Sequence, residues 1–296
     1  MGWLKNKNKF NGLEELKNSL LLNPDGVLVE LGNELKQQDF STCWMVLKEV
    51  LPLLEKTKKR DIVRRLLANS VSFLIALVDQ RQERELAIEC LSYLPSREVI
   101  EFLAMLLNHK DDTVQLMASG ALKNHTPRLV VPLLVDGLVK ENVAAARAGQ
   151  VLMAMGFFAQ EVLMDAYHKA EPRVQASILE LMILGDNPKC RPFVEEALKS
   201  QHMFLKKTAL EAVEFFSLAE LWTEVVMCLA EEDWVIKAKA LEVLAKLKVV
   251  EALEYVEPFV RDPDPWVSQC AARCIKVLEQ SRIEEYTNES NRGISC

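Results

Sequence analysis

The amino-acid sequence predicts an all-α protein in which short helical hairpins stack into an α–α superhelix. Half of the 296 residues are hydrophobic, whereas only 10 are glycine and 11 are proline. This composition suits packed helices better than a turn-rich β-sandwich. One apolar pattern returns every 30 or 31 residues, and an acidic residue precedes most of its copies. Internal periods of this length are the signature of repeat architectures.

A column of apolar residues defines the second helix of each predicted hairpin. Residues four, seven and eight positions after the column are also apolar, which places them on one buried helical face. The column consists of Val114, Ala144, Val174, Leu205, Ile236 and Val267. Three positions before it stand Asp111, Glu141, Glu171, His202, Asp233 and Asp264. An acidic side chain there can cap free N–H groups and favours the positive end of the helix dipole.

The first helix of each hairpin is marked by two further apolar series, eleven and fifteen residues before the column. The nearer series is Leu103, Leu133, Leu163, Val194, Val225 and Val256, and the farther one is Val99, Leu129, Ala159, Cys190, Leu221 and Ala252. A hairpin of about 30 residues cannot bury its own apolar face and must stack on its neighbours. Ala87, Cys90 and Leu91 suggest one more second helix upstream.

The repeats define three predicted segments. Residues 1–80 do not follow the period and are interpreted as a helical N-terminal cap or degenerate repeats. Residues 81–280 hold the repeats. Residues 281–296 turn polar and are expected to form a flexible tail.

Two sequence stretches resemble the HEAT-repeat family. Asp262-Pro263-Asp264-Pro265-Trp266-Val267, followed by Ala271 and Ala272, looks like the HEAT motif, and so does the turn Leu184-Gly185-Asp186-Asn187-Pro188. The closest subtype is the short bacterial form called phycocyanobilin-lyase-like, and the resemblance covers about residues 80 to 280. It implies a HEAT-like solenoid and no catalytic residue. The family often places an arginine just after the valine; Lys206 and Lys237 are the nearest equivalents here.

Charge and cysteine usage restrict the kinds of partner. Residues 1–65 carry 12 Lys and Arg against 9 Asp and Glu, and the remainder carries 24 against 34. An acidic body argues against a nucleic-acid partner, because that affinity comes chiefly from cationic side chains. Seven scattered cysteines inside apolar patterns indicate reduced thiols and a cytoplasmic protein without a signal sequence or membrane-spanning segment.

The sequence offers no catalytic constellation. It lacks a phosphate-binding glycine loop, a nucleophile–histidine signature and a zinc-protease pattern, so we expect no enzyme, no cofactor and no metal. Cys270 and Cys274 lie four residues apart, but core packing explains them better than metal binding. The four histidines, His109, His125, His168 and His202, are interpreted as surface or capping residues.

An acidic ladder is the best-defined candidate binding surface. The position six residues after the column points away from the buried face, toward the expected concave surface. It holds Gly120, Gln150, Glu180, Glu211, Glu242 and Arg273, and Glu214 lies near the same face. The alternative is that these glutamates merely occupy a solvated helix face, where glutamate is a favourable helix former.

Aromatic residues stand near the start of successive second helices. Phe204 and Trp266 lie just before the column, and Trp234 lies one residue earlier. They are candidates for a rim that grips a partner, because such side chains concentrate at binding hot spots. The alternative is that they cover the turn of the neighbouring repeat.

The N-terminal segment interleaves aromatic and basic residues. Its candidate membrane-contact residues are Trp3, Lys5, Lys7, Lys9 and Phe10. Such a segment can lie on an anionic membrane surface, although it is short and binds weakly without a second signal. The alternative is a disordered leader.

Three functions remain open at this point. The first is a cytoplasmic scaffold or adaptor that binds a basic or helical segment of a protein partner on the second-helix face. The second is a peripheral membrane scaffold. The third is an enzyme or a nucleic-acid processor, since related helical solenoids include lyases and DNA glycosylases. The oligomeric state is left open.

Overall fold

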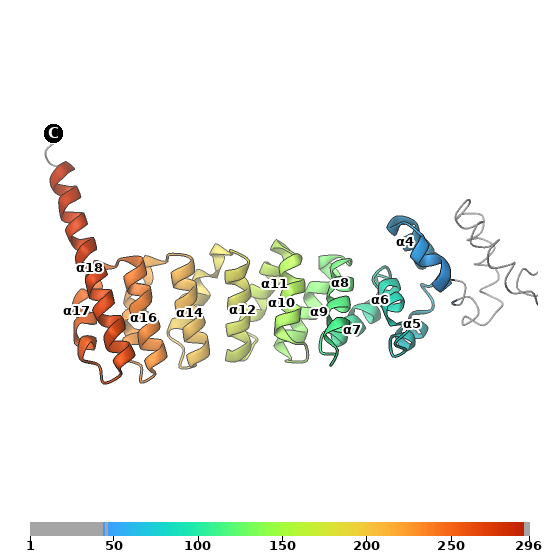
Figure 1. Cartoon of the computed structure of the whole chain (residues 1–296), viewed down its shortest axis with the longest axis horizontal. Helices are drawn as coiled ribbons and strands as arrows, with labels where there is room; N and C mark the ends of the chain where they lie inside the picture. The colour runs from blue at the N-terminus through green and yellow to red at the C-terminus, as the bar shows by residue number, and fades with distance from the viewer. Residues whose placement is uncertain (1–43, 45–46, 293–296) are drawn as a thin grey trace, which may run out of the picture. The chain divides into compact units, whose positions relative to one another are not determined.

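The computed structural model describes residue 44 and residues 47–292, and it is helical throughout (Figure 1). Every regular element in this part of the chain is an α-helix or a short 3-10 helix, with no β-strand. The all-α prediction is therefore confirmed. None of the described helices is both long and apolar enough to cross a bilayer.

The chain divides by packing into two units. Unit 1 is Met1–Leu134 with Ala146–Ala154, and unit 2 is Val135–Ala145 with Met155–Cys296. The division passes through the second predicted hairpin, formed by α9 (Pro127–Val139) and α10 (Ala145–Ala154). The cap predicted for residues 1–80 stays an interpretation, and residues 1–43, 45 and 46 lie outside the described residues.

Unit 1 contains the helices that precede this division. They are the 3-10 helix η2 (Leu51–Leu53), α4 (Lys56–Leu66), α5 (Val71–Val78), α6 (Arg84–Leu91), α7 (Arg97–Leu106), α8 (Asp112–Lys123), the first part of α9, and α10. Helix α5 packs on α6, α7 packs on α8, and α6 packs on α8. Ala87, Cys90 and Leu91 are buried in α6, as expected for an additional second helix.

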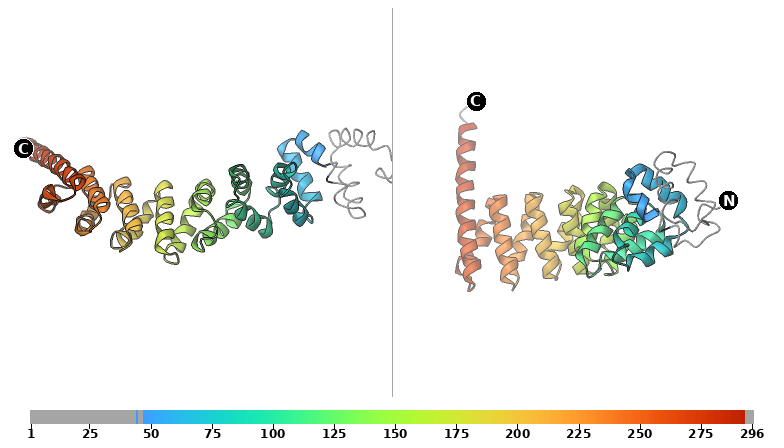
Figure 2. Two further views of the ribbon diagram at one scale, coloured as in Figure 1. Left: turned by 60° about the horizontal axis from the view of Figure 1, so that its bottom comes forward. Right: turned by 45° about the vertical axis from the view of Figure 1, so that its right-hand side comes forward.

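Unit 2 has two layers of helices (Figures 1 and 2). The first layer holds α11 (Phe157–Tyr167), α13 (Arg191–Leu198), α15 (Trp222–Met227) and α17 (Leu253–Val256), with 3-10 turns η3 (Pro188–Cys190), η4 (Ala219–Leu221), η5 (Cys228–Ala230), η6 (Val250–Ala252) and η7 (Glu257–Arg261). The second layer holds α12 (Pro172–Leu184), α14 (Met203–Phe215), α16 (Trp234–Leu247) and α18 (Pro265–Arg292). Each second-layer helix packs on the next one and on the first-layer helix of its own hairpin.

The predicted register holds in the second helices. All six residues four positions after the column are completely buried, namely Ala118, Ala148, Ile178, Ala209, Ala240 and Ala271. Three of the predicted acidic caps accept backbone hydrogen bonds at helix starts, and they are Asp111, Asp233 and Asp264. The helical repeat-like arrangement is thus confirmed in α8, α12, α14, α16 and α18, where the predicted face is buried except for the half-buried Ile275.

The second hairpin departs from the predicted register. Ala144 is exposed, Leu129 is 41% exposed and Leu133 is half-buried, so these three assignments to the core were wrong. Val130 and Leu134 are buried in α9 instead. The turn before α10 is the physical reason: its Val143 approaches Gly137 so closely that a Cβ there would lie 2.6 Å from the valine Cγ2. Val143 is half-buried, so this residue, rather than Ala144, is partly covered in the turn.

Three inter-repeat turns share one backbone conformation. Asp186, Ser217 and Lys248 follow α12, α14 and α16 at intervals of 31 residues, and all have positive φ values of 48°, 53° and 55°. In each turn the next backbone N–H bonds back to the helix, as Leu218 N does to Val213 O at 3.0 Å. This is the Schellman end of a helix, which usually carries glycine at the left-handed position.

Helix α18 is longer than its counterparts. It continues through Arg292 and extends past the neighbouring helices (Figures 1 and 2), whereas the sequence led us to expect a polar tail from residue 281. Helix formers such as Glu284 and Glu285 follow Leu278, and no glycine or proline occurs between Leu278 and Gly293. Residues 293–296 lie outside the described residues.

Candidate docking surface

Each second-layer helix of unit 2 carries one ridge whose residues are exposed or half-buried, apart from the buried Cys270 on α18. The ridge begins one residue before the column and continues at the fourth, seventh and eleventh positions after that start, which fall on one side of a helix. The four ridges are Arg173, Ser177, Glu180 and Leu184 on α12; Phe204, Thr208, Glu211 and Phe215 on α14; Val235, Lys239, Glu242 and Lys246 on α16; and Trp266, Cys270, Arg273 and Val277 on α18. Together these sixteen residues form what we call the ridge surface.

The acidic ladder forms the third row of the ridge surface. Glu180 and Glu242 are exposed, and Glu211 is half-buried with a carboxylate oxygen 3.7 Å from Lys207 Nζ. Arg273 completes the row on α18 and is exposed. The row therefore presents three negative charges followed by one positive charge on four adjacent helices.

Glu214 differs from the ladder residues because it pairs with two lysines of the next second-layer helix. Its two carboxylate oxygens each lie 2.6 Å from a lysine Nζ, one of Lys239 and one of Lys246. Hydrogen bonds from these lysines hold the pKa of Glu214 below its usual range. This carboxylate therefore ties α14 to α16.

The aromatic residues at the helix starts are open to solvent. Phe204 is 74% exposed, and Trp234 and Trp266 are each 48% exposed. About half of the surface of each tryptophan is covered, so the alternative in which these residues cover a neighbouring turn stays open. The ring of Trp266 also lies 5.7 Å from the guanidinium carbon of Arg273, a cation–π contact along α18.

Sequence reasoning missed two exposed apolar residues at the far end of the same ridges. Leu184 on α12 and Phe215 on α14 are 63% and 55% exposed. Both lie four residues after a ladder glutamate, so the helical period that identified Glu180 and Glu211 would have found them. On these two helices the acidic row is thus followed by an apolar one.

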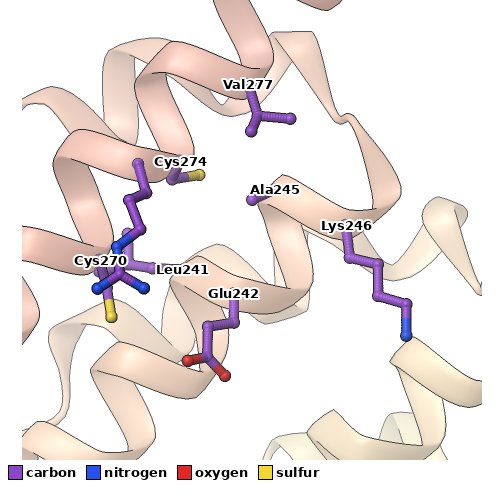
Figure 3. A pocket seen from close by; sticks show the side chains of 8 residues that line it. Leu241, Glu242, Ala245, Lys246, Cys270, Cys274 and Val277 are labelled. Carbon is purple, nitrogen blue, oxygen red and sulfur yellow. The ribbon is translucent and has the colours of Figure 1, made fainter.

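A groove opens in the ridge surface between α16 and α18 (Figure 3). It has a volume of about 310 Å³ and is lined by Leu241, Glu242, Ala245, Lys246, Cys270, Arg273, Cys274 and Val277. Leu241 and Cys274 are buried at its base, whereas Glu242, Lys246 and Arg273 are exposed at its rim. The groove brings together Glu242 of the predicted ladder and Arg273, which occupies the equivalent position on α18.

Ion pairs between successive repeats hold the second layer in place. Lys206 of α14 pairs with Glu231, and Lys237 of α16 pairs with Asp262 across 2.8 Å. Both lysines follow the apolar column directly, where the HEAT resemblance places a basic residue. The hydrogen bond from Lys237 holds the pKa of Asp262 below its usual range.

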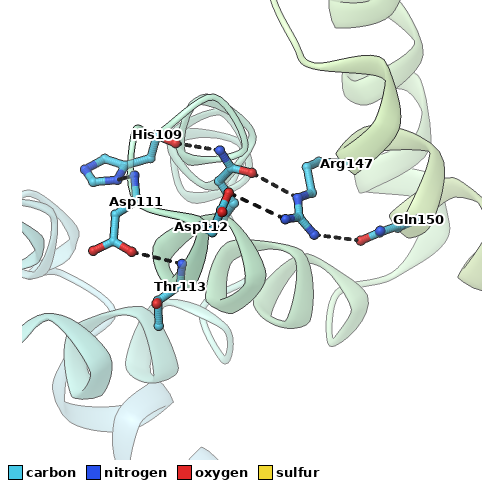
Figure 4. A network of polar contacts seen from close by, with 7 residues as sticks. His109, Asp111, Asp112, Thr113, Arg147 and Gln150 are labelled. Atoms are coloured by element: carbon cyan, nitrogen blue, oxygen red, sulfur yellow. Dashed lines mark hydrogen bonds and ion pairs between the residues drawn. The ribbon is translucent and has the colours of Figure 1, made fainter.

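Unit 1 uses an arginine for the same purpose (Figure 4). Arg147 of α10 donates from Nε to Gln115 Oε1 of α8 across 2.9 Å and lies 3.7 Å from the carboxylate of Asp112. Gln115 in turn donates to the His109 carbonyl oxygen across 2.6 Å. These contacts link successive second helices of unit 1.

The described cysteines are poor candidates for chemistry. Cys90, Cys190, Cys228, Cys270 and Cys274 are buried free thiols. Burial raises the pKa of Cys90 and Cys274 to about 12, so their thiolates are scarce at neutral pH. Over residue 44 and residues 47–292, no three His, Cys, Asp or Glu side chains gather to hold a metal ion.

The remaining predicted residues fall in two groups. His125 was interpreted as a surface or capping residue, but it is 6% exposed and therefore buried. Trp3, Lys5, Lys7, Lys9 and Phe10 lie outside the described residues, so membrane contact stays a prediction.

Comparisons with known proteins assign the chain to no family. No family model matches the chain, and no curated protein matches it. Among solved structures the chain is similar to an engineered protein of the Northeast Structural Genomics Consortium, with 17% identity, a TM-score of 0.43, and coverage of 90% of this chain and 89% of that one. A second engineered protein from the same consortium shows 17% identity and a TM-score of 0.31 over 71% of this chain and 96% of its own.

Proposed function

We propose that this protein is a non-catalytic cytoplasmic scaffold or adaptor, and that the ridge surface of unit 2 binds a basic segment of a protein partner. The observation that carries the proposal is the row of Glu180, Glu211 and Glu242 on three adjacent helices, next to exposed aromatic side chains. Aromatic side chains are enriched at protein interfaces and among binding hot spots, and an acidic row complements the charge of a basic partner.

We further propose that the hairpins form a HEAT-like solenoid with the ridge surface on its concave side. The 31-residue period, the second-layer packing and the lysines that follow the column support this assignment. A concave surface would bring several ridges to one elongated partner, as extended binding faces of repeat proteins do.

The spacing of the ladder indicates what the partner must offer. Adjacent packed helices lie roughly 8–10 Å apart, so the carboxylates of successive ridges are separated by about that distance. An extended chain covers it in roughly three residues and a helix in roughly six or seven. We therefore expect basic residues at one of these two intervals in the bound segment.

The proposal is tested by selecting binders from a random displayed peptide library with the full chain. We expect the selected peptides to be rich in Lys and Arg and to lose at least about tenfold in affinity, or about 1.4 kcal/mol, when Glu180, Glu211 and Glu242 are all changed to Lys. Fluorescence anisotropy with a labelled peptide measures the change.

A matched control reverses three exposed glutamates of the first layer, Glu161, Glu254 and Glu257. This variant has the same net charge as the ladder variant, so it separates a local contact from general attraction. Equal weakening by both variants, or no weakening by the ladder variant, would contradict the proposal.

A further inference from the structure

The groove between α16 and α18 lies at the place where the preceding pair of second-layer helices has an ionic bridge. Between α14 and α16, Glu214 bridges Lys239 and Lys246. One period of 31 residues later, the same three positions hold Ala245, Cys270 and Val277. These side chains are short and apolar and cannot form an ionic bridge, so the groove between α16 and α18 lies where this bridge is missing.

The lining of the groove suits an aliphatic side chain. All three replacement residues line it, together with the buried Leu241 and Cys274. A cavity of about 150 Å³ already accepts a small hydrocarbon, and the groove measures about 310 Å³. Transfer of an aliphatic side chain from water into such surroundings is favourable in proportion to the apolar area that it buries.

The charged side chains at the rim of the groove favour one orientation of a bound segment (Figure 3). Glu242 lies on the α16 side and Arg273 on the α18 side, while Lys246 is already engaged by Glu214. A partner side chain in the groove would therefore have a cationic neighbour toward α16 and an anionic neighbour toward α18. The opposite orientation would place like charges together.

We infer that this groove is the anchor subsite of the ridge surface and takes one aliphatic side chain of the partner, flanked by a basic residue toward Glu242 and an acidic residue toward Arg273. This inference rests on the proposed function. It adds the anchor and the polarity of the bound segment, which the acidic row alone does not specify.

The test uses a selected basic peptide and changes both sides of the contact. We expect Ala245→Leu, which fills the groove, to weaken binding at least about tenfold, and Ala245→Ser, which leaves it open, to change it little. Ala146→Leu makes the same enlargement at an exposed position of α10 and serves as the control. Replacing the aliphatic residue of the peptide by alanine should weaken binding to the parent chain and cause no further loss with Ala245→Leu.

The outcomes separate the two proposals. If the peptide responds to reversal of the ladder glutamates but binds Ala245→Leu as tightly as the parent chain, the anchor subsite is overturned and the docking surface stands. If the peptide responds to neither change, both are overturned. An Arg273→Glu variant that prefers a peptide with its acidic residue changed to Lys would support the assigned direction.

Discussion

His125 is a buried imidazole in unit 1 with a cation nearby. Burial lowers its pKa from the ordinary value of 6.5, and the positive charge of Arg64 lowers it further, while a hydrogen bond with the backbone of Leu91 acts in the opposite direction. The net effect favours the neutral ring in the folded protein. The unfolded chain keeps the ordinary pKa.

This difference makes stability depend on pH. As pH falls below 6.5, His125 becomes protonated in the unfolded chain but stays neutral in the folded protein. The free energy of unfolding therefore decreases with falling pH until the lowered folded pKa is passed. Above 6.5 the effect is absent. We expect His125→Gln to reduce this dependence, as measured by urea denaturation between pH 5 and about 8.

His202→Gln provides the control, because His202 is exposed at the start of α14. Its removal should leave the pH dependence nearly as it is in the parent chain. Identical slopes for the parent and the His125 variant would show that the buried imidazole does not titrate as described.

At the scale of the elements, the left-handed turns store strain that glycine would relieve. Ser217 has a φ of 53° between α14 and η4, and no glycine occupies the left-handed position of the three equivalent turns. A non-glycine residue in this region costs about 1–2 kcal/mol. We expect Ser217→Gly to raise the free energy of unfolding by about 0.5–1 kcal/mol, as measured by chemical denaturation.

Introducing a glycine inside a helix should change the free energy of unfolding in the opposite direction. Ala272→Gly lies at an exposed position of α18 and is expected to lower the free energy of unfolding by about 1 kcal/mol. A loss of stability from Ser217→Gly as well would argue against the left-handed conformation of that turn.

The ion pair between Lys237 and Asp262 links α16 to the hairpin of α17 and α18. The side chain of Asp262 is only 6% exposed, so Lys237→Met leaves a poorly solvated carboxylate without its partner. We expect the free energy of unfolding to fall by about 1–3 kcal/mol. Thermal or urea unfolding of the single variants and of the double variant with Asp262→Asn measures the coupling.

The double variant should lose less than the sum of the two single losses, because neither charge is then left alone. The pair also depends on pH with a defined sign. Since its contact with Lys237 lowers the pKa of Asp262, the stabilisation is present above 3.8 and is lost as pH falls through the lower folded value. Strict additivity would contradict this account.

At the scale of the whole molecule, the repeat could be predicted because one helical face obeys one period. The residues four positions after the column are all small or aliphatic and all buried, from Ala118 to Ala271. The second hairpin was not predictable in the same way, because the close approach of Val143 to Gly137 is a tertiary contact that periodicity does not contain.

The candidate site was predictable only in part for a similar reason. Exposure of Glu180 and Glu242 follows from helix geometry alone, as does exposure of Leu184 and Phe215. The groove depends on the combined size of Ala245, Cys270 and Val277 on two helices, and the pairing of Glu214 depends on two lysines of the next repeat. Such contacts require the packing to be known.

Helix α18 ends the described stack with a polar outer face. The position five residues after the column is a fully buried leucine in the three preceding helices, Leu179, Leu210 and Leu241, and is the exposed Ala272 in α18. Lys276 replaces Ala245 in the same way. Terminal repeats need such a polar face to remain soluble.

We expect a variant with both Ala272→Leu and Lys276→Ala to self-associate more strongly than the parent chain, because it restores the apolar contact face of an inner repeat. Sedimentation velocity over a range of concentrations measures the shift. Ala272→Ser with Lys276→Ala removes the same charge without the leucine and should behave like the parent chain. Equal self-association of both variants would assign the effect to charge alone.

The groove between α16 and α18 also bears on the evolution of binding preference in this chain. Three side chains decide whether two neighbouring second-layer helices are joined by an ionic bridge. The repeats that contain these helices follow the same 31-residue period. Exchanging Glu214, Lys239 and Lys246 for the trio one period later would therefore move the vacancy by one copy and leave the backbone alone. Because the exchange alters both trios, substitutions at six codons would shift the groove by one copy within the same binding face.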